Sequence, residues 1–209
     1  MFTLKGLITE EELVSTLDAI DKAAELTLSN FRRAAGLVSS LKRTAVDQTK
    51  EKIMRFEVKP IFEDVIHTLH SKFKQTAIEI QFDCPKDLAV YSIPGPLEQI
   101  ITNLMMNSLI HGFEEGKNGG RIVIAVRLKE KRLHVDYSDT GKGMAPETVE
   151  KVFEPFFTTH RAHGSGLGMY VCHNLVTSQL NGTMTCESTV GKGVLFRIEF
   201  PVAAFSRFP

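Results

Sequence analysis

The residues best suited to chemistry lie in the segment 100–113, IITNLMMNSLIHGF, of this 209-residue chain. The segment has the pattern of a helix, yet it carries Asn103, Asn107 and His111 at intervals of four residues. At about 100° per residue, both asparagines fall beside the apolar face, where their amides can line the edge of a pocket. The side-chain oxygen of Asn107 suits a hard cation such as Mg²⁺. Alternatively, both amides cap a neighbouring loop and His111 packs against the fold.

A second candidate is the stretch YSDTGKGMAPE, in which Asp139 follows a predicted strand and precedes Gly141 and Gly143. Glycines permit positive φ angles and a close approach of the backbone to a ligand. A partly desolvated carboxylate at a strand end can accept a hydrogen bond from an exocyclic amine. That contact would favour adenine over guanine, which presents a carbonyl at this position. The alternative is an ordinary turn in which Asp139 caps its own backbone.

A third candidate is the glycine-rich stretch HGSGLGMYVC at 163–172, which leads into a predicted helix. Exposed backbone N–H groups at a helix start can hold an anion. The spacing and the preceding loop argue against a dinucleotide-binding crossover, and the absence of a Walker lysine-serine pattern excludes a P-loop. A flexible loop without a ligand is the alternative.

A fourth candidate is the segment VFEPFFTTH, which contains Phe153, Phe156 and Phe157. Phenylalanines in such a loop are core anchors by default. Their functional alternative is to hinge a lid over a bound nucleotide.

Regular elements must position these residues. A capping box at Thr9 and apolar residues every three or four positions predict a long helix over 9–50, suited to a bundle or coiled coil. Periodicity in the rest of the chain predicts a mixed-sheet α/β sandwich rather than a doubly wound parallel sheet. The predicted helices are 60–74, 95–113, 146–152 and 166–180, and the predicted strands are 77–84, 121–128, 132–139, 183–189 and 193–201.

Composition excludes several classes of protein. The formal net charge is zero, so no nucleic-acid partner is expected. Cys84, Cys172 and Cys186 lack the CxxC spacing of a zinc site and suggest a reducing compartment. No apolar run is long enough to span a bilayer, so we expect no membrane contact by this chain and a cytoplasmic location. A longer parent protein could still be anchored in the inner membrane.

Together, the order and spacing of the four candidates resemble the N, G1, F and G2 boxes of the GHKL ATPase superfamily. That superfamily includes gyrase B, Hsp90, MutL and the sensor histidine kinases. The resemblance covers about 56–202, and GKGVLFRIEFP is similar to the closing strand of histidine kinase catalytic domains. It implies the Bergerat ATP-binding fold, a two-layer α/β sandwich of a mixed sheet and three main helices, preceded here by the long N-terminal helix. ATP and Mg²⁺ would lie between the helix at 95–113 and the loop at 153–165.

The resemblance also assigns site residues. Asn107 would hold the metal, and Asn103 is a candidate catalytic residue. His111, on its residue type alone, is the other candidate, as a general base, although a histidine at a helix end more often packs or caps. The residues expected to contact the nucleotide are Asn107, Asp139, Gly141, Gly143, Met144, Phe153, Phe157, Thr158, Gly164, Ser165, Gly166, Leu167 and Gly168.

Asn103 distinguishes a kinase from a hydrolase. Hydrolases of the superfamily carry a glutamate base at this position, and an amide cannot accept a proton at neutral pH. The chain therefore favours phosphoryl transfer to a protein over ATP hydrolysis. Ile110 departs from the pattern of histidine kinases, which often have a lysine or arginine there. Lys142, Arg161 or His160 could supply the missing phosphate contact.

The N-terminal part resembles the second helix of a histidine kinase dimerisation hairpin. We therefore predict a homodimerising segment over 1–55 and a catalytic ATP-binding domain over 56–209. None of the seven histidines is followed by an acidic residue, so the phosphoacceptor is expected outside this chain. The expected partners are an upstream sensor domain and the receiver domain of a response regulator. The alternatives are a non-catalytic nucleotide-binding or partner-binding module and a small chaperone-like ATPase, against which Asn103 argues.

Overall fold

The computed structural model describes residues 11–25, 27–28, 31, 52–159 and 165–204. By the packing of its backbone the chain divides into two units, Met1–Ala45 and Val46–Pro209. In the first unit, residues 11–25 form a helix whose side chains are all exposed. The rest of the helix predicted over 9–50 falls mostly outside the described residues, including its Thr9 cap, and the predicted boundary at 55/56 stays a prediction.

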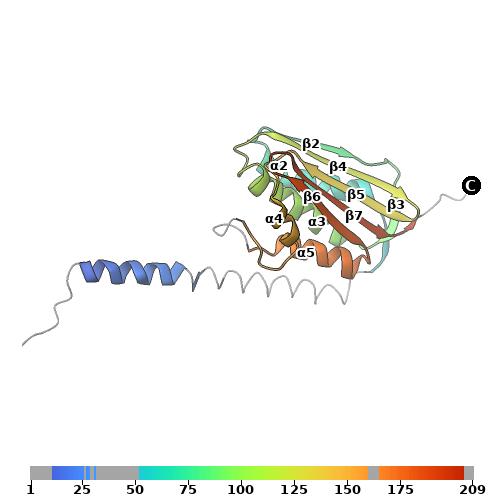
Figure 1. Cartoon of the computed structure of the whole chain (residues 1–209). Helices are drawn as coiled ribbons and strands as arrows, with labels where there is room; N and C mark the ends of the chain where they lie inside the picture. The colour runs from blue at the N-terminus through green and yellow to red at the C-terminus, as the bar shows by residue number, and fades with distance from the viewer. Residues whose placement is uncertain (1–10, 26, 29–30, 32–51, 160–164, 205–209) are drawn as a thin grey trace, which may run out of the picture. The chain divides into compact units, whose positions relative to one another are not determined.

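The second unit is a two-layer α/β sandwich (Figure 1). Its main sheet has five strands in the order β2-β4-β5-β7-β6, with β2 and β4 parallel and the other neighbours antiparallel. The strands are β2 (Ile78–Asp83), β4 (Gly120–Lys129), β5 (Arg132–Asp139), β6 (Thr183–Thr189) and β7 (Gly193–Pro201). The mixed-sheet sandwich with three main helices is confirmed.

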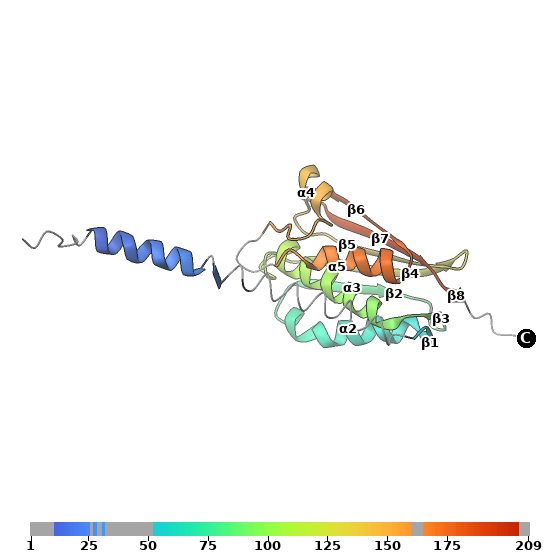
Figure 2. The same ribbon diagram turned by 90° about the horizontal axis from the view of Figure 1, so that it is seen from below.

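Three helices cover one face of this sheet: α2 (Val58–Phe73), α3 (Pro94–Asn107) and α5 (Gly168–Asn174) (Figure 2). The short helix α4 (Pro146–Lys151) follows β5 and contacts β6. In α2 the buried side chains recur every three or four residues, which places one apolar stripe against the core. In β5 every second residue is buried, so Val135, Tyr137 and Asp139 share the face that the helices cover.

The sequence did not predict a second, smaller sheet. It has the order β1-β3-β8 and is built from β1 (Met54–Glu57), β3 (Ala89–Ser92) and β8 (Ala203–Ala204). These strands have at most four residues each, too few for the alternation of apolar and polar residues to stand out. In the described part of the chain, no helix is both long and apolar enough to cross a membrane.

Two of the predicted helices end in π turns. The predicted helix 95–113 is α3 followed by the π turn η1 (Ser108–Gly112), and the predicted helix 166–180 is α5 followed by η2 (Leu175–Gln179). In η1 the Phe113 N–H donates to the Ser108 carbonyl at 2.8 Å, five residues back instead of four. A π turn holds one extra residue and changes which side chains face a neighbouring element. The periodicity of a regular helix could not predict this change.

Candidate functional site

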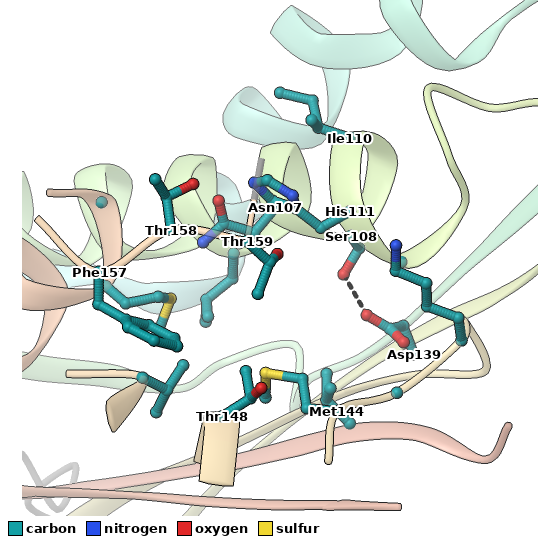
Figure 3. Close-up of a pocket in the computed structure, with 18 of the residues that line it drawn as sticks. Asn107, Ser108, Ile110, His111, Asp139, Met144, Thr148, Phe157, Thr158 and Thr159 are labelled. Atoms are coloured by element: carbon teal, nitrogen blue, oxygen red, sulfur yellow. Dashed lines mark hydrogen bonds between the residues drawn. The ribbon is translucent and has the colours of Figure 1, made fainter. Parts of the chain in front are cut away.

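A cavity of about 470 Å³ lies between the helical layer, the loop from β5 to α4 and the loop from α4 to α5. Figure 3 shows Asn107, Ser108 and His111 projecting toward it from α3 and η1, with Asp139 and Met144 facing them. Of the residues predicted from the sequence, the cavity lining includes Asn107, His111, Asp139, Gly143, Met144, Phe157, Thr158, Ser165, Gly166 and Gly168.

Asp139 ends strand β5 and is buried, with 6% of its surface exposed. Its Oδ1 accepts a hydrogen bond from the Gly141 N–H at 2.9 Å, and its Oδ2 accepts one from the Ser108 hydroxyl (Figure 3). Burial raises the pKa of the Asp139 carboxyl, whereas hydrogen bonds from the Ser108 hydroxyl and the Gly141 and Val194 N–H groups lower it. A carboxylate held in this way can accept a hydrogen bond from an amine inside the cavity.

The Ser108 hydroxyl has a second partner. Its Oγ lies 2.8 Å from the hydroxyl oxygen of Tyr137, and both side chains are buried. Neither residue was predicted from the sequence. The available signals were that Ser108 directly follows Asn107 and that Tyr137 lies two residues before Asp139, on the same face of the strand.

The turn after Asp139 is attached to the structure on two sides. The Lys142 N–H donates to the Gly112 carbonyl at 3.0 Å, and the Lys142 carbonyl accepts a hydrogen bond from the Gly191 N–H at 2.7 Å. The Met144 N–H donates to the Ser188 hydroxyl at 2.8 Å. The turn is therefore held between η1 and the β6–β7 hairpin before any ligand binds.

Glycine is required where this turn meets its neighbours. Gly143 has a φ of +67°, and a Cβ there would lie 2.1 Å from the Thr189 carbonyl oxygen. Gly141 does not line the cavity, but a Cβ on it would lie 2.7 Å from the Gly112 Cα atom. Both glycines thus act by letting backbones approach each other.

Asn107 and His111 line the wall of the cavity near Thr158 and Thr159 (Figure 3). The Asn107 amide oxygen is a suitable ligand for Mg²⁺. No group of three or more His, Cys, Asp or Glu residues in the described ranges could hold a metal.

Asn103 does not line the cavity. Its amide nitrogen donates to the Gly168 carbonyl at 3.3 Å and approaches the Cys172 sulfur at 3.4 Å, and its amide oxygen accepts a hydrogen bond from Gln99. Burial raises the pKa of the Cys172 thiol to about 12, so the thiol stays protonated at neutral pH. In this structure Asn103 connects α3 to the first turn of α5, and its predicted catalytic role stays a prediction.

The phenylalanines of the loop after α4 have different surroundings. Phe157 lines the cavity, whereas Phe153 packs against His173 and Phe196, with ring centroids 4.9 Å and 6.4 Å away. Phe156 has a φ of +66° and is largely exposed. The structure therefore places Phe153 in packing and only Phe157 at the cavity.

The glycine-rich segment contributes Ser165, Gly166 and Gly168 to the lining, whereas Leu167 is buried beside it. Gly166 has a φ of +69°, and a Cβ there would lie 2.4 Å from the backbone of Phe156. Gly164 falls outside the described residues, as do His160 and Arg161. The lining also contains residues that were not predicted from the sequence. The polar or glycine residues among them are Ser108, Gly112, Thr148 and Thr159, and the apolar ones are Leu104, Ala145, Val152, Met169, Val194 and Phe196.

Comparison with protein families agrees with this geometry. Residues 93–204 match the family described as histidine kinase-, DNA gyrase B-, and HSP90-like ATPase. The match confirms the resemblance stated from the sequence.

The curated relatives include sensor histidine kinases. The chain is 38% identical to ZraS of Klebsiella oxytoca over 128 residues, which are 60% of this chain and 26% of that protein. It is 33% identical to ZraS of Salmonella typhimurium over 196 residues, which are 92% of this chain and 35% of that protein. The chain thus spans between a quarter and about a third of these relatives.

Among solved structures, the nucleotide-free catalytic domain of histidine kinase ThkA is similar, with a TM-score of 0.64 and 26% identity. The alignment covers 73% of this chain and 97% of that domain. ThkA in complex with the response regulator protein TrrA also matches, with a TM-score of 0.62 and 23% identity over 93% of this chain and 53% of that one.

Proposed function

Because the chain belongs to the family of histidine kinase-, DNA gyrase B-, and HSP90-like ATPases, we propose that it is the ATP-binding catalytic portion of a sensor histidine kinase. It would transfer the γ-phosphoryl group of Mg-ATP to a histidine that this chain does not carry. The observation that supports this proposal most strongly is the pairing of a buried, hydrogen-bonded Asp139 with the Asn107 amide in one cavity.

Each end of the cavity has a role in this proposal. Asp139 accepts a hydrogen bond from the exocyclic amine of adenine, and Met144 and Phe157 supply apolar contact to the nucleoside. Asn107 would hold Mg²⁺ through its amide oxygen, and the bound cation would supply charge neutralisation at the phosphates. Catalysis then consists largely of positioning and electrostatic stabilisation, because phosphoryl transfer needs little covalent chemistry from the protein.

Asn103 supports transfer to a protein over hydrolysis. Its amide cannot act as a general base, and it hydrogen-bonds the Gly168 carbonyl rather than facing the cavity. His111 lines the cavity and is the other candidate for a catalytic role. The direct test is mutation of His111 to Gln, which removes a titratable base and preserves a polar side chain.

We also propose two partners. The helix at 11–25 exposes Leu13, Val14, Leu17 and Ile20, each at least 50%, with spacings typical of a bundle interface. A second copy of the chain would cover these residues in a homodimer. The phosphoryl group would pass on to a receiver domain, by analogy with the ThkA complex with a response regulator. An upstream sensor domain and a cytoplasmic location belong to the same proposal.

A transfer assay tests the function. The chain is incubated with Mg-ATP and the separately supplied helix of the parent protein that bears the acceptor histidine. Acid-labile phosphate on the helix is the expected result, and the Asp139→Asn variant is the matched negative control.

A second candidate function is a non-catalytic nucleotide-binding module. It is favoured by Ile110, because this residue of the cavity lining is apolar and offers no charge to a phosphate. Tight nucleotide binding without labelled acceptor supports that candidate and contradicts the kinase.

A further inference from the structure

Asp139 is held at both of its carboxylate oxygens. Oδ1 accepts from the Gly141 backbone and Oδ2 accepts from the Ser108 hydroxyl. These hydrogen bonds on different oxygens, together with the one from the Val194 N–H, fix the plane of the carboxylate, and a carboxylate has about four lone-pair sites, so one is left for a ligand. A buried ionised group needs such partners, because desolvation otherwise favours its neutral form.

The directions of the hydrogen bonds follow from simple counting. A serine hydroxyl has one hydrogen, and in the structure Ser108 donates it to Asp139, which is the only direction open to an ionised carboxylate. The Tyr137 hydroxyl, 2.8 Å from the Ser108 oxygen, must then be the donor in that pair. The result is a directed relay in which Tyr137 donates to Ser108 and Ser108 donates to Asp139.

We propose that Ser108, supported by Tyr137, is a positioning residue that determines base specificity by keeping Asp139 a pure hydrogen-bond acceptor. This inference rests on the proposed nucleotide site and deepens it. An ionised Asp139 accepts from the amine of adenine and repels the carbonyl that guanine presents at the same position. A protonated Asp139 could donate to that carbonyl, so discrimination between the bases depends on its charge.

The other titratable groups around Asp139 do not take over the role of Ser108 as its side-chain hydrogen-bond donor. Tyr137 lies on its own strand, and burial raises the pKa of the phenol, so it remains a donor at neutral pH. From β6, Cys186 has a thiol whose pKa burial raises to about 12, so it carries no charge. His111 of η1 and Lys142 of the turn also line the cavity, but Ser108 is the side chain that hydrogen-bonds Asp139.

The experiment measures the dissociation constants of ADP and GDP across pH for the wild type and for Ser108→Ala and Tyr137→Phe. We expect Ser108→Ala to weaken ADP binding at neutral pH about tenfold, the worth of a hydrogen bond to a charged group. As the pH is lowered, the Ser108→Ala variant should begin to lose ADP binding at a higher pH than the wild type does. Its preference for ADP over GDP should also be smaller than that of the wild type. Tyr137→Phe should shift both properties in the same direction by a smaller amount.

Ser138→Ala is the matched control. Ser138 lies between Tyr137 and Asp139 on the opposite face of β5, so its loss removes a hydroxyl without touching the relay. Thermal melts establish that each variant is folded, and Tyr137→Phe keeps the test open if Ser108→Ala unfolds. Equal losses of ADP and GDP affinity with an unchanged pH profile would show only a structural role and overturn the inference. If the wild type binds no adenine nucleotide, the proposed function itself fails.

Discussion

The two ends of the cavity differ in how their polar groups are supported. Around Asp139, both carboxylate oxygens are hydrogen-bonded and the following turn is held by η1 and by the β6–β7 hairpin. Around Asn107, the lining comes from one helix face and from loop residues such as Thr158 and Thr159. The Asp139 end is rigid because paired strands support it, whereas the Asn107 end, under the proposed function, would take its further metal ligands from a bound nucleotide. If Asp139 reads the base as proposed, base recognition is preformed, whereas phosphate and metal binding would depend on the ligand.

The largest expected effect is on the rigid end. Gly193 has a φ of +82°, and a Cβ there would lie 1.8 Å from the Asp139 carbonyl oxygen. We expect Gly193→Ala to lower the free energy of unfolding by more than about 3 kcal/mol in chemical denaturation, because strain and a backbone clash combine.

The hairpin offers a matched control for that variant. Gly191 has a similar φ of +78°, but a Cβ there would meet no atom within 4 Å. Gly191→Ala should cost only about 1 kcal/mol, the conformational part alone. Equal losses in the two variants would mean that contact with the Asp139 turn does not matter for stability.

Removing the charge of Asp139 should weaken nucleotide binding without lowering the stability of the fold. Asp139→Asn should weaken ADP binding about a hundredfold, because the charged acceptor is lost. Because burial raises the pKa of Asp139 in the folded state, its contribution to stability is present at low pH and is lost as the pH rises through the folded pKa. The nucleotide-free variant should therefore be at least as stable as the wild type at pH 7.

The measurement is a pair of titrations, ADP binding at neutral pH and denaturant unfolding between about pH 4 and pH 8. The stability advantage of Asp139→Asn should shrink toward the acidic end, where Asp139 of the wild type becomes protonated. If the stability advantage of Asp139→Asn over the wild type instead grows on acidification, the pKa of Asp139 is not raised in the folded state.

The adaptable end is tested through its metal. Asn107→Ala should reduce the gain in ATP affinity that Mg²⁺ produces by roughly tenfold, because one oxygen ligand is lost, and leave adenosine binding nearly unchanged. Isothermal titration with and without Mg²⁺ checks this. Asn103→Ala, one turn earlier, is the control: it should lower stability through its contacts with Gly168 without abolishing the effect of Mg²⁺.

The smallest expected effect concerns Ile110, which lines the cavity without a charge. Ile110→Lys should tighten ATP binding a few fold, steepen its dependence on salt and leave adenosine binding unchanged, because a cation attracts phosphate. Binding measured at two ionic strengths tests this. A parallel change for adenosine would show that the two ends of the cavity are not independent.

Local patterns predicted much of the fold. The strands predicted over 77–84 and 132–139 and the helix predicted over 60–74 are β2, β5 and α2, whose observed bounds differ from the predicted ones by at most two residues. Turn chemistry identified Asp139 with its glycines, since glycine at tight turns is a local requirement. These features depend on neighbours in the sequence, and for that reason they could be predicted from a single sequence.

Other features depend on neighbours in space. Nothing local distinguishes Phe153 from Phe157, yet one packs on His173 and the other lines the cavity. Local geometry likewise places both asparagines of α3 beside the apolar face, and only the position of α5 gives Asn103 its hydrogen bond to the Gly168 carbonyl.

By itself, the sequence determined the family, the α/β sandwich and the order of the motifs, because spacing and periodicity are properties of the chain. The tertiary structure decided which of those motif residues reach the cavity. It also decided that Ser108, at the start of a π turn, meets Tyr137 and Asp139 from strand β5. That relay joins residues about thirty positions apart, and the burial that makes Asp139 dependent on it exists only once the layers have packed.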